Sequence, residues 1–160
     1  MAHPARTAPV TGIAKIAVYA RTYTAGSAAA VADTHYLGDI TTASDPVTRQ
    51  LQSLETSDRT IAGLGPIASS LSFTTVLAPS NTILETIRSA HSSGVPLTLM
   101  LCRGTEPDTG AKNYVISGAY GISNFQTGFS NNVHTVDISA TCTDTSTLTF
   151  GFNVSAFPSV

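Results

Sequence analysis

The sequence predicts a mainly β fold, a β-sandwich or barrel with one inserted α-helix at about residues 81–93. Short stretches in which apolar and polar residues alternate recur along the chain, which is the pattern of half-buried strands. Turns rich in Gly, Asn, Asp and Pro separate the stretches in the last third. One segment switches to helical spacing. Residues 1–160 are enough for a single domain with a sizeable core.

The composition indicates a surface that is partly covered in an assembly, or a Thr-rich β surface. The chain is 42% hydrophobic and 11% charged, against the usual charged share of about 25%. Its net charge is −2 and it has no basic run, so binding to a nucleic-acid backbone or an anionic membrane is disfavoured.

We interpret the two ends of the sequence, residues 1–12 and 155–160, as an N-terminal and a C-terminal arm. The first contains Pro4 and Pro9 and has no periodic pattern. It also lacks the apolar core of a signal peptide, and no stretch approaches the ~18 apolar residues of a membrane span. We therefore expect a cytosolic protein without a membrane partner.

The first strand is expected at residues 13–24, where the residue types alternate between two faces. Ala14, Ile16, Val18 and Ala20 share one face, and Lys15, Tyr19, Arg21 and Tyr23 share the other. A small-residue loop and the short extended piece "HYLGDI" follow. Residues 41–57 have no clean period and many charges, and so predict a long loop of the kind that is usually functional or disordered.

A second strand and the helix follow Pro66. In "SSLSFTTVLA", Leu71, Phe73, Thr75 and Leu77 alternate with polar residues and are expected to face inward. The helix is predicted from its apolar stripe, which consists of Ile83, Leu84, Ile87, Ala90 and His91. Thr82 and Glu85 have capping-box spacing, Ser80 and Asn81 are competing caps, and Gly94 ends the helix.

Four strands are expected in the last third: "VPLTLMLCR", "KNYVISGAYGISNF", "NNVHTVDISATCT" and "TSTLTFGFNVS". In the third, alternation places His134, Val136, Ile138, Ala140 and Cys142 on one face, and Thr135, Asp137, Ser139 and Thr141 on the other. In the fourth, Leu148, Phe150, Phe152 and Val154 are expected to face inward. The connecting turns are "GTEPDTGA", "QTGFSNN" and "TDTS".

Gly63-Leu64-Gly65 resembles part of a dinucleotide-binding fingerprint but lacks its context. That motif follows a strand and opens a helix, whereas Pro66 and a strand come next here. We interpret the two glycines as a turn.

The sequence predicts no enzyme, cofactor or metal site. The four histidines have no ligand spacing, no Gly-x-Ser-x-Gly is present, and His134 and Asp137 point to opposite faces of a strand. Cys102 and Cys142 fit two buried free thiols, with a single disulfide as the alternative. Asn153-Val154-Ser155 is read as a chance glycosylation match.

The order of these features resembles the major tail tube protein of long-tailed, siphovirus-type bacteriophages, in the phage tail tube and Hcp-like fold family. The resemblance covers roughly residues 13–154, and "IAGLG" followed by a strand, "APSN" and a helix is its strongest part. It departs from the family at Leu77-Ala78, where an Asp or Tyr is usual. The matching pieces are "YLGDITTASD", "LQSLETSDRTIAGLGPIASSLSFTTVLAPSN", "TILETIRSAHSSGVPLTLMLCRG", "YVISGAYGISNF" and "VHTVDISATCTDTSTLTFGF".

This resemblance implies a virion protein, assembled in the host bacterial cytoplasm, whose rings of six copies stack into a tail tube for DNA ejection. Its other implied partners are the tape measure protein, the tail terminator and the baseplate or distal tail proteins, with transient, non-specific passage of DNA. The alternatives are a virion decoration or head-completion protein, an Hcp-like secretion tube protein and, disfavoured by the scarcity of aromatic residues, a carbohydrate-binding sandwich.

The resemblance also implies roles for particular residues. The long loop would contact neighbouring copies or the next ring, and so would the anchors that follow it. These residues are Asp45, Arg49, Glu55, Asp58, Arg59, Ile61 and Leu64. The lumen would be lined by the polar face of a late strand, at Thr135, Asp137 and Thr141.

Overall fold

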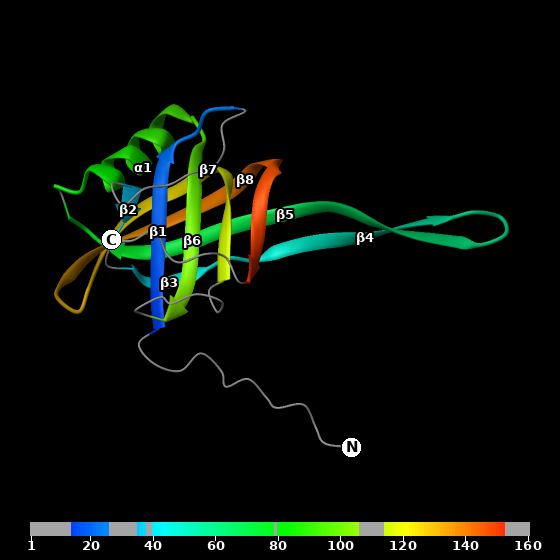
Figure 1. The fold of residues 1–160 in the computed structure, drawn as a ribbon, viewed down its shortest axis with the longest axis horizontal. Helices are drawn as coiled ribbons and strands as arrows, with labels where there is room; N and C mark the ends of the chain where they lie inside the picture. The colour runs from blue at the N-terminus through cyan, green and yellow to red at the C-terminus, as the bar shows by residue number, and fades with distance from the viewer. Residues whose placement is uncertain (1–13, 26–34, 38–39, 79, 106–113, 153–160) are drawn as a thin grey trace, which may run out of the picture.

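A computed structural model describes residues 14–25, 35–37, 40–78, 80–105 and 114–152. Eight antiparallel strands form one curled sheet in the order β2-β1-β6-β7-β8-β5-β3, and β4 pairs with β5 off this path. The helix α1 packs against β7, β1 and β2 (Figure 1). The strands are β1 (Ala14–Thr22), β2 (Tyr36–Leu37), β3 (Ile40–Ser44), β4 (Val47–Glu55), β5 (Thr60–Val76), β6 (Leu97–Thr105), β7 (Tyr114–Ser130) and β8 (Val133–Phe152).

The mainly β fold with one helix is confirmed, but the long loop predicted at residues 41–57 is wrong. Most of that segment forms β3 and β4, and β4 pairs with residues 60–69 of β5 to make a long two-stranded hairpin. Figure 1 shows this hairpin projecting from the body of the protein. We call it the arm, residues 47–69. Alternation failed as a signal because almost every arm residue is exposed, so neither face selects apolar side chains.

Gly63-Leu64-Gly65 is also not a turn. It lies within β5, where Gly63 pairs with Gln52 and Leu64 pairs with Leu51. The register shifts between Arg49 and Leu51, opposite Gly65. A β-carbon on Gly65 would lie 3.0 Å from the carbonyl oxygen of Gln50, so glycine permits this close approach of the two strands.

The main core fills the space between the curled sheet and α1. Leu71, Phe73 and Thr75 of β5 face inward as predicted, and Val136, Ile138 and Ala140 of β8 meet the same core. His134, predicted on that inward face, is exposed because it lies beyond the end of the core, next to the β7–β8 turn.

β1 is buried on both faces, whereas the sequence predicted one polar face. Val18 and Ala20 belong to the main core. Ala17 and Tyr19 belong to a second cluster with Cys102 and Val115, on the other side of the sheet. Both faces of β1 are therefore covered: Tyr36 and Met100 pack against the second cluster, and the Tyr19 ring supplies apolar area there despite its hydroxyl.

The helix α1 spans Thr82–Ser93. Of the competing caps, Asn81 is the N-cap: its side-chain oxygen accepts from the backbone N–H groups of Ile83 and Leu84. Gly94 ends the helix at φ 72°, as predicted. Leu84, Ile87 and Ala90 are buried, whereas His91, predicted in the same stripe, is exposed.

β7 and β8 form a hairpin that is longer than predicted. "QTGFSNN" is not all turn, because β7 continues to Ser130 and the chain reverses at Asn131 and Asn132, both with positive φ. "TDTS" does not separate two strands either: β8 runs through it with register shifts. The Asp144 side chain accepts a hydrogen bond from the Ser146 amide there. It thereby satisfies a backbone N–H group at a point where the strand pairing is irregular.

Some predictions on the last strand are corrected or fall outside the description. Phe150 is half exposed rather than inward, while Leu148 packs against the core as predicted. Val154, the two terminal arms and residues 106–111 of the predicted turn "GTEPDTGA" lie outside the described residues, whereas the first two residues of that turn, Gly104 and Thr105, belong to β6. Cys102 and Cys142 are free thiols, the first buried and the second half-buried. No helix in the described ranges has the length and apolar content needed to span a membrane.

Candidate functional site

The arm exposes large apolar side chains in cross-strand pairs. Leu51 of β4 lies opposite Leu64 of β5, and Leu54 lies opposite Ile61. Their exposed fractions are 78%, 64%, 64% and 44%, respectively. Ile61 and Leu64 were predicted as contact residues, but Leu51 and Leu54 were missed because their segment read as a loop. Four exposed aliphatic side chains on one projecting element indicate a surface that binds another macromolecule.

The charged contact residues predicted on the arm are exposed. Arg49 and Glu55 lie on β4. Asp58 and Arg59 lie at the tip, where the Thr56 hydroxyl donates to the Arg59 carbonyl oxygen at 2.7 Å and its oxygen accepts from the Arg59 amide at 3.2 Å. These bonds close the tip, so the charged side chains there stand on an ordered turn.

Asp45 differs from the other predicted contact residues, because its partner is in the same chain. Its carboxylate accepts from two nitrogens of Arg103 on β6, at 2.6 and 3.0 Å, and only 13% of the Asp45 side chain is exposed. Arg103 also donates to the carbonyl oxygen of Ala43 at 2.8 Å. Asp45 therefore fixes the base of the arm.

A second contact at the arm's base is the hydrogen bond of 2.8 Å between the hydroxyl groups of Ser69 and Tyr120. The Tyr120 ring is fully buried, and this burial raises the pKa of its phenol to about 12. The amide of Ser70 also donates to the Pro46 carbonyl oxygen at 3.2 Å. Side-chain and backbone bonds thus hold the arm against β6 and β7.

The predicted lumen residues lie on one polar face of the sheet, opposite the core. Asp137 is exposed, and its carboxylate accepts from the Thr74 hydroxyl of β5 at 2.6 Å. Thr135 pairs with Val76, and Thr141 pairs with Ser70. The structure brings these three together with β5 in a continuous surface. Its other polar members are Ser70, Ser72, Thr74 and Ser139.

An exposed patch also lies at the turn between β7 and β8. Phe129 is 63% exposed and Val133 is 40% exposed. The Phe129 ring lies 4.7 Å from the His134 ring, centroid to centroid. Figure 1 shows this turn at the end of the molecule opposite the arm. The sequence reading missed this patch because Phe129 fell within a predicted turn.

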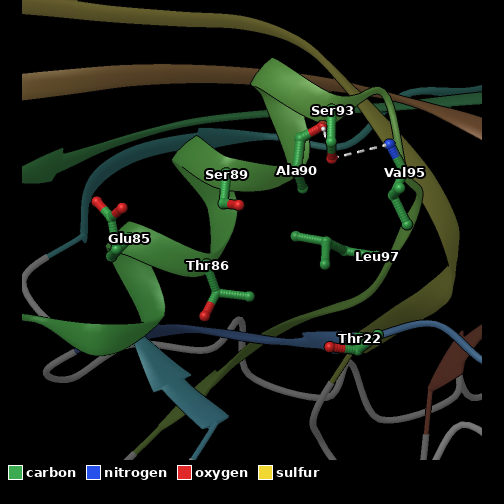
Figure 2. Close-up of a pocket in the computed structure, with 8 residues that line it drawn as sticks. All are labelled: Thr22, Glu85, Thr86, Ser89, Ala90, Ser93, Val95 and Leu97. Atoms are coloured by element: carbon green, nitrogen blue, oxygen red, sulfur yellow. Dashed lines mark hydrogen bonds between the residues drawn. The ribbon is translucent and has the colours of Figure 1, made fainter.

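A hollow between α1 and the ends of β1 and β6 is a candidate for a small-molecule site (Figure 2). Hydroxyl groups line much of it, but Glu85 pairs with Arg88 and the Ser93 hydroxyl accepts from the Val95 amide at 3.4 Å. The Thr86 hydroxyl also serves the helix, because it donates to the Thr82 carbonyl oxygen at 2.9 Å. Within the described ranges, no three His, Cys, Asp or Glu residues gather as a metal site.

No protein-family profile matches the sequence, and no curated protein matches it. Solved structures do match its fold. A chain in the tail of an empty GTA particle, with C6 symmetry, has a TM-score of 0.54 and 14% identity over 86% of this chain and 96% of that chain. The SPP1 tail tube has a TM-score of 0.62 and 14% sequence identity, over 94% of this chain and 82% of that chain. The tube-terminating cap of the anti-feeding prophage has a TM-score of 0.64 and 12% sequence identity, over 94% of this chain and 96% of that chain.

These proteins come from tails and tubes, and their chains match along nearly the whole length of this one. The resemblance predicted from the order of sequence features is thereby confirmed at the level of the fold. The chain therefore shares its fold with chains of the GTA tail, the SPP1 tail tube and the tube-terminating cap of the anti-feeding prophage.

Proposed function

We propose that this protein is a structural virion protein that polymerises, as stacked rings of six, into a phage tail tube through which DNA is ejected. The observation that carries the proposal is the arm with its four exposed aliphatic side chains, on a chain with the tail tube fold. The C6 symmetry of the similar GTA tail supports six copies in a ring. A head-to-tail contact that closes gives a ring, and rings that stack give a tube.

In this proposal the polar face of β5 and β8 lines the lumen. A DNA conduit should not hold phosphates, so its lining should be polar without being basic. The residues Thr135, Asp137 and Thr141 meet this requirement, because their face carries hydroxyls and a carboxylate. Arg49, Glu55, Asp58 and Arg59 of the arm would form charged contacts with neighbouring copies.

The proposal extends to place and partners. The protein would assemble in the host cytoplasm, reside in the virion tail, and bind the tape measure protein, the tail terminator and the baseplate or distal tail proteins at the tube's length and ends. It would have no catalytic activity and no cofactor. These points follow from the proposed role.

A second candidate is a cap that terminates a tube, because the anti-feeding prophage cap also has this fold. A cap needs one stacking face, whereas a tube subunit needs two. The two roles therefore predict different assemblies of the purified protein.

Negative-stain microscopy and native mass spectrometry of the concentrated protein test the proposal. Hollow tubes or stacks of six-copy rings are expected, and rings that never stack favour the cap. A chain that stays monomeric at high concentration contradicts both. A variant with residues 51–64 replaced by an Asn-Gly turn should remain folded and fail to assemble, because the body of the sheet does not depend on the outer arm.

A further inference from the structure

The arm joins the sheet at a point where β5 changes partners. β5 pairs with β8 from Ser70 to Val76, and with β4 from Thr60 to Ser69. At this junction the Ser70 amide donates to the Pro46 carbonyl oxygen at 3.2 Å. Among the described residues, the ladder between β5 and β8 thus stops where the arm begins. A two-stranded ribbon that leaves a sheet in this way can bend at its base, because few contacts hold it there.

Two side-chain contacts cross this junction, one to each strand of the arm's base. On the β4 side, the Asp45 carboxylate accepts from two nitrogens of Arg103 on β6, at 2.6 and 3.0 Å. On the β5 side, the hydroxyl groups of Ser69 and of Tyr120 on β7 are 2.8 Å apart. One contact alone would let the arm rotate about it. Contacts to both strands, made from two different strands of the body, fix its direction.

Both contacts are polar, although they lie beside the apolar core. Tyr120 and Ser69 are buried, and Tyr120 is itself a member of the main core cluster. A buried hydrogen bond or ion pair adds little net stability compared with well-packed apolar side chains, because its groups lose their hydration. Its energy does depend steeply on distance and angle. Polar contacts at this place therefore select one direction of the arm more than they add stability to the core.

We propose that Arg103 and Tyr120 are positioning residues for self-assembly, which hold the arm of the free chain in the direction that it needs in the tube. This inference rests on the proposed self-assembly and deepens it. Neither residue has to touch a neighbouring copy. Each acts through the arm, by raising the share of free chains whose arm points correctly before two copies meet.

The physical reason is the cost of selecting one direction each time a copy is added. If only a fraction of the free chains has a competent arm, the apparent affinity between copies falls by that fraction. A loosened arm that points correctly in about one chain in ten would raise the protein concentration at which tubes first form about tenfold. Contacts within the free chain remove this cost by preorganisation.

The direction of the arm can be measured on the dilute, free chain by double electron–electron resonance between two spin labels. Thr42→Cys on β3 and Asp58→Cys at the tip of the arm carry the labels, because both positions are exposed. Cys142→Ser removes the half-buried thiol from every sample, and Cys102 is buried.

A narrow distribution of distances is expected for this labelled parent. Ser69→Ala removes the partner of Tyr120, and Arg103→Gln removes the partner of Asp45, so each should broaden the distribution. The variant with both changes should give the broadest one. A variant whose distribution stays as narrow as the parent's would overturn the role of the contact that it removes.

Ser117→Ala is the matched control for Ser69→Ala. Ser117 is also buried, and its hydroxyl lies 2.8 Å from the hydroxyl of Thr149, in a contact between β7 and β8. Both variants lose one such contact, so both should melt a few degrees below the parent. Only Ser69→Ala should broaden the distance distribution. Equal broadening in the control would show a general loosening of the sheet and would overturn the inference.

Assembly of the unlabelled, full-length variants completes the test. Light scattering against protein concentration gives the threshold for tube formation, at a temperature where circular dichroism shows every variant folded. Ser69→Ala and Arg103→Gln should each raise this threshold about tenfold, and Ser117→Ala should leave it unchanged. A broadened arm with an unchanged threshold would overturn the link between arm direction and assembly. If the unaltered chain forms no tubes, the proposed function fails, whereas the distance measurement still decides whether Arg103 and Tyr120 hold the arm.

Discussion

Arg103 on β6 and Asp45, at the junction of β3 and β4, form an ion pair of 2.6 Å that joins the base of the arm to the centre of the sheet. Arg103 extends this contact by donating to the carbonyl oxygen of Ala43. Two segments far apart in the sequence, β6 and the end of β3 with the residue that follows it, thus meet at one guanidinium group, whose planar donors suit several oxygens at once. The direction of the arm is therefore set within the monomer.

Breaking this pair should destabilise the protein measurably. Arg103→Gln leaves the Asp45 carboxylate, with 13% of its side chain exposed, without its cation, and we expect a loss of about 2 kcal/mol in the free energy of unfolding. Urea unfolding of Arg103→Gln, Asp45→Asn and the double variant measures the coupling between the two residues. Glu85→Gln is the control, because the Glu85–Arg88 pair is exposed and its loss should cost below about 0.5 kcal/mol. Equal losses from the two pairs would contradict the role assigned to Arg103.

Two glycines of the arm should respond differently to the same substitution. At Gly65 a new β-carbon would lie 3.0 Å from the Gln50 carbonyl oxygen, whereas at Gly63 it would meet nothing within 4 Å. Gly65→Ala should therefore disturb the register shift and loosen the arm, and Gly63→Ala should be neutral or slightly stabilising. The rate of hydrogen exchange at the backbone amides of β4 measures this loosening directly. Faster exchange in both variants, or in neither, would refute the role of Gly65.

The stability should fall in alkaline solution, in part through Tyr120. Burial raises the pKa of its phenol from the usual value near 10 to about 12. The unfolded chain therefore releases this proton at a lower pH than the folded chain does. The stabilisation is complete below pH 10 and is lost as the pH rises toward 12, at up to about 1.4 kcal/mol per pH unit.

Tyr120→Phe isolates this contribution from the other groups that titrate at high pH. The variant loses the hydrogen bond to Ser69, so it should be less stable by about 1 kcal/mol near neutral pH. The difference between the two proteins should shrink as the pH rises from about 9 to 11 in urea unfolding. A constant difference over this range would contradict the raised pKa of Tyr120.

The sequence predicted the body of the fold where burial is one-sided. β5 beyond Ser69 and β8 from Thr135 to Ala140 alternate because one face meets the core and the other meets solvent. The helix was predicted for the same reason. Sequence reasoning failed at β1, which is covered on both faces, and at β4, which is covered on neither, because alternation requires two unlike surroundings.

The candidate site was predicted in part. Ile61 and Leu64 were identified through a resemblance, but their partners Leu54 and Leu51 depend on strand register, which the register shift at Gly65 obscures. A search for isolated aliphatic residues among charged and polar ones at residues 47–64 could have found all four. Asp45 could not be separated from the arm's other charges, because its partner Arg103 is distant in the sequence.

The lumen assignment predicts a change in the reactivity of a cysteine at Asp137. This side chain is exposed on the face opposite the core, whereas Glu85 lies exposed on α1, on the core side of the sheet. Before assembly, Asp137→Cys and Glu85→Cys should both react with a small maleimide and with a polymer-linked one. In tubes, Cys at 137 should lose its reaction with the polymer-linked reagent, since a narrow channel excludes it, while Cys at 85 keeps both reactions.

The unaltered chain sets the background from Cys102 and Cys142, which are buried and half-buried. Equal access of the bulky reagent to both positions in assembled tubes would place the polar face outside the lumen.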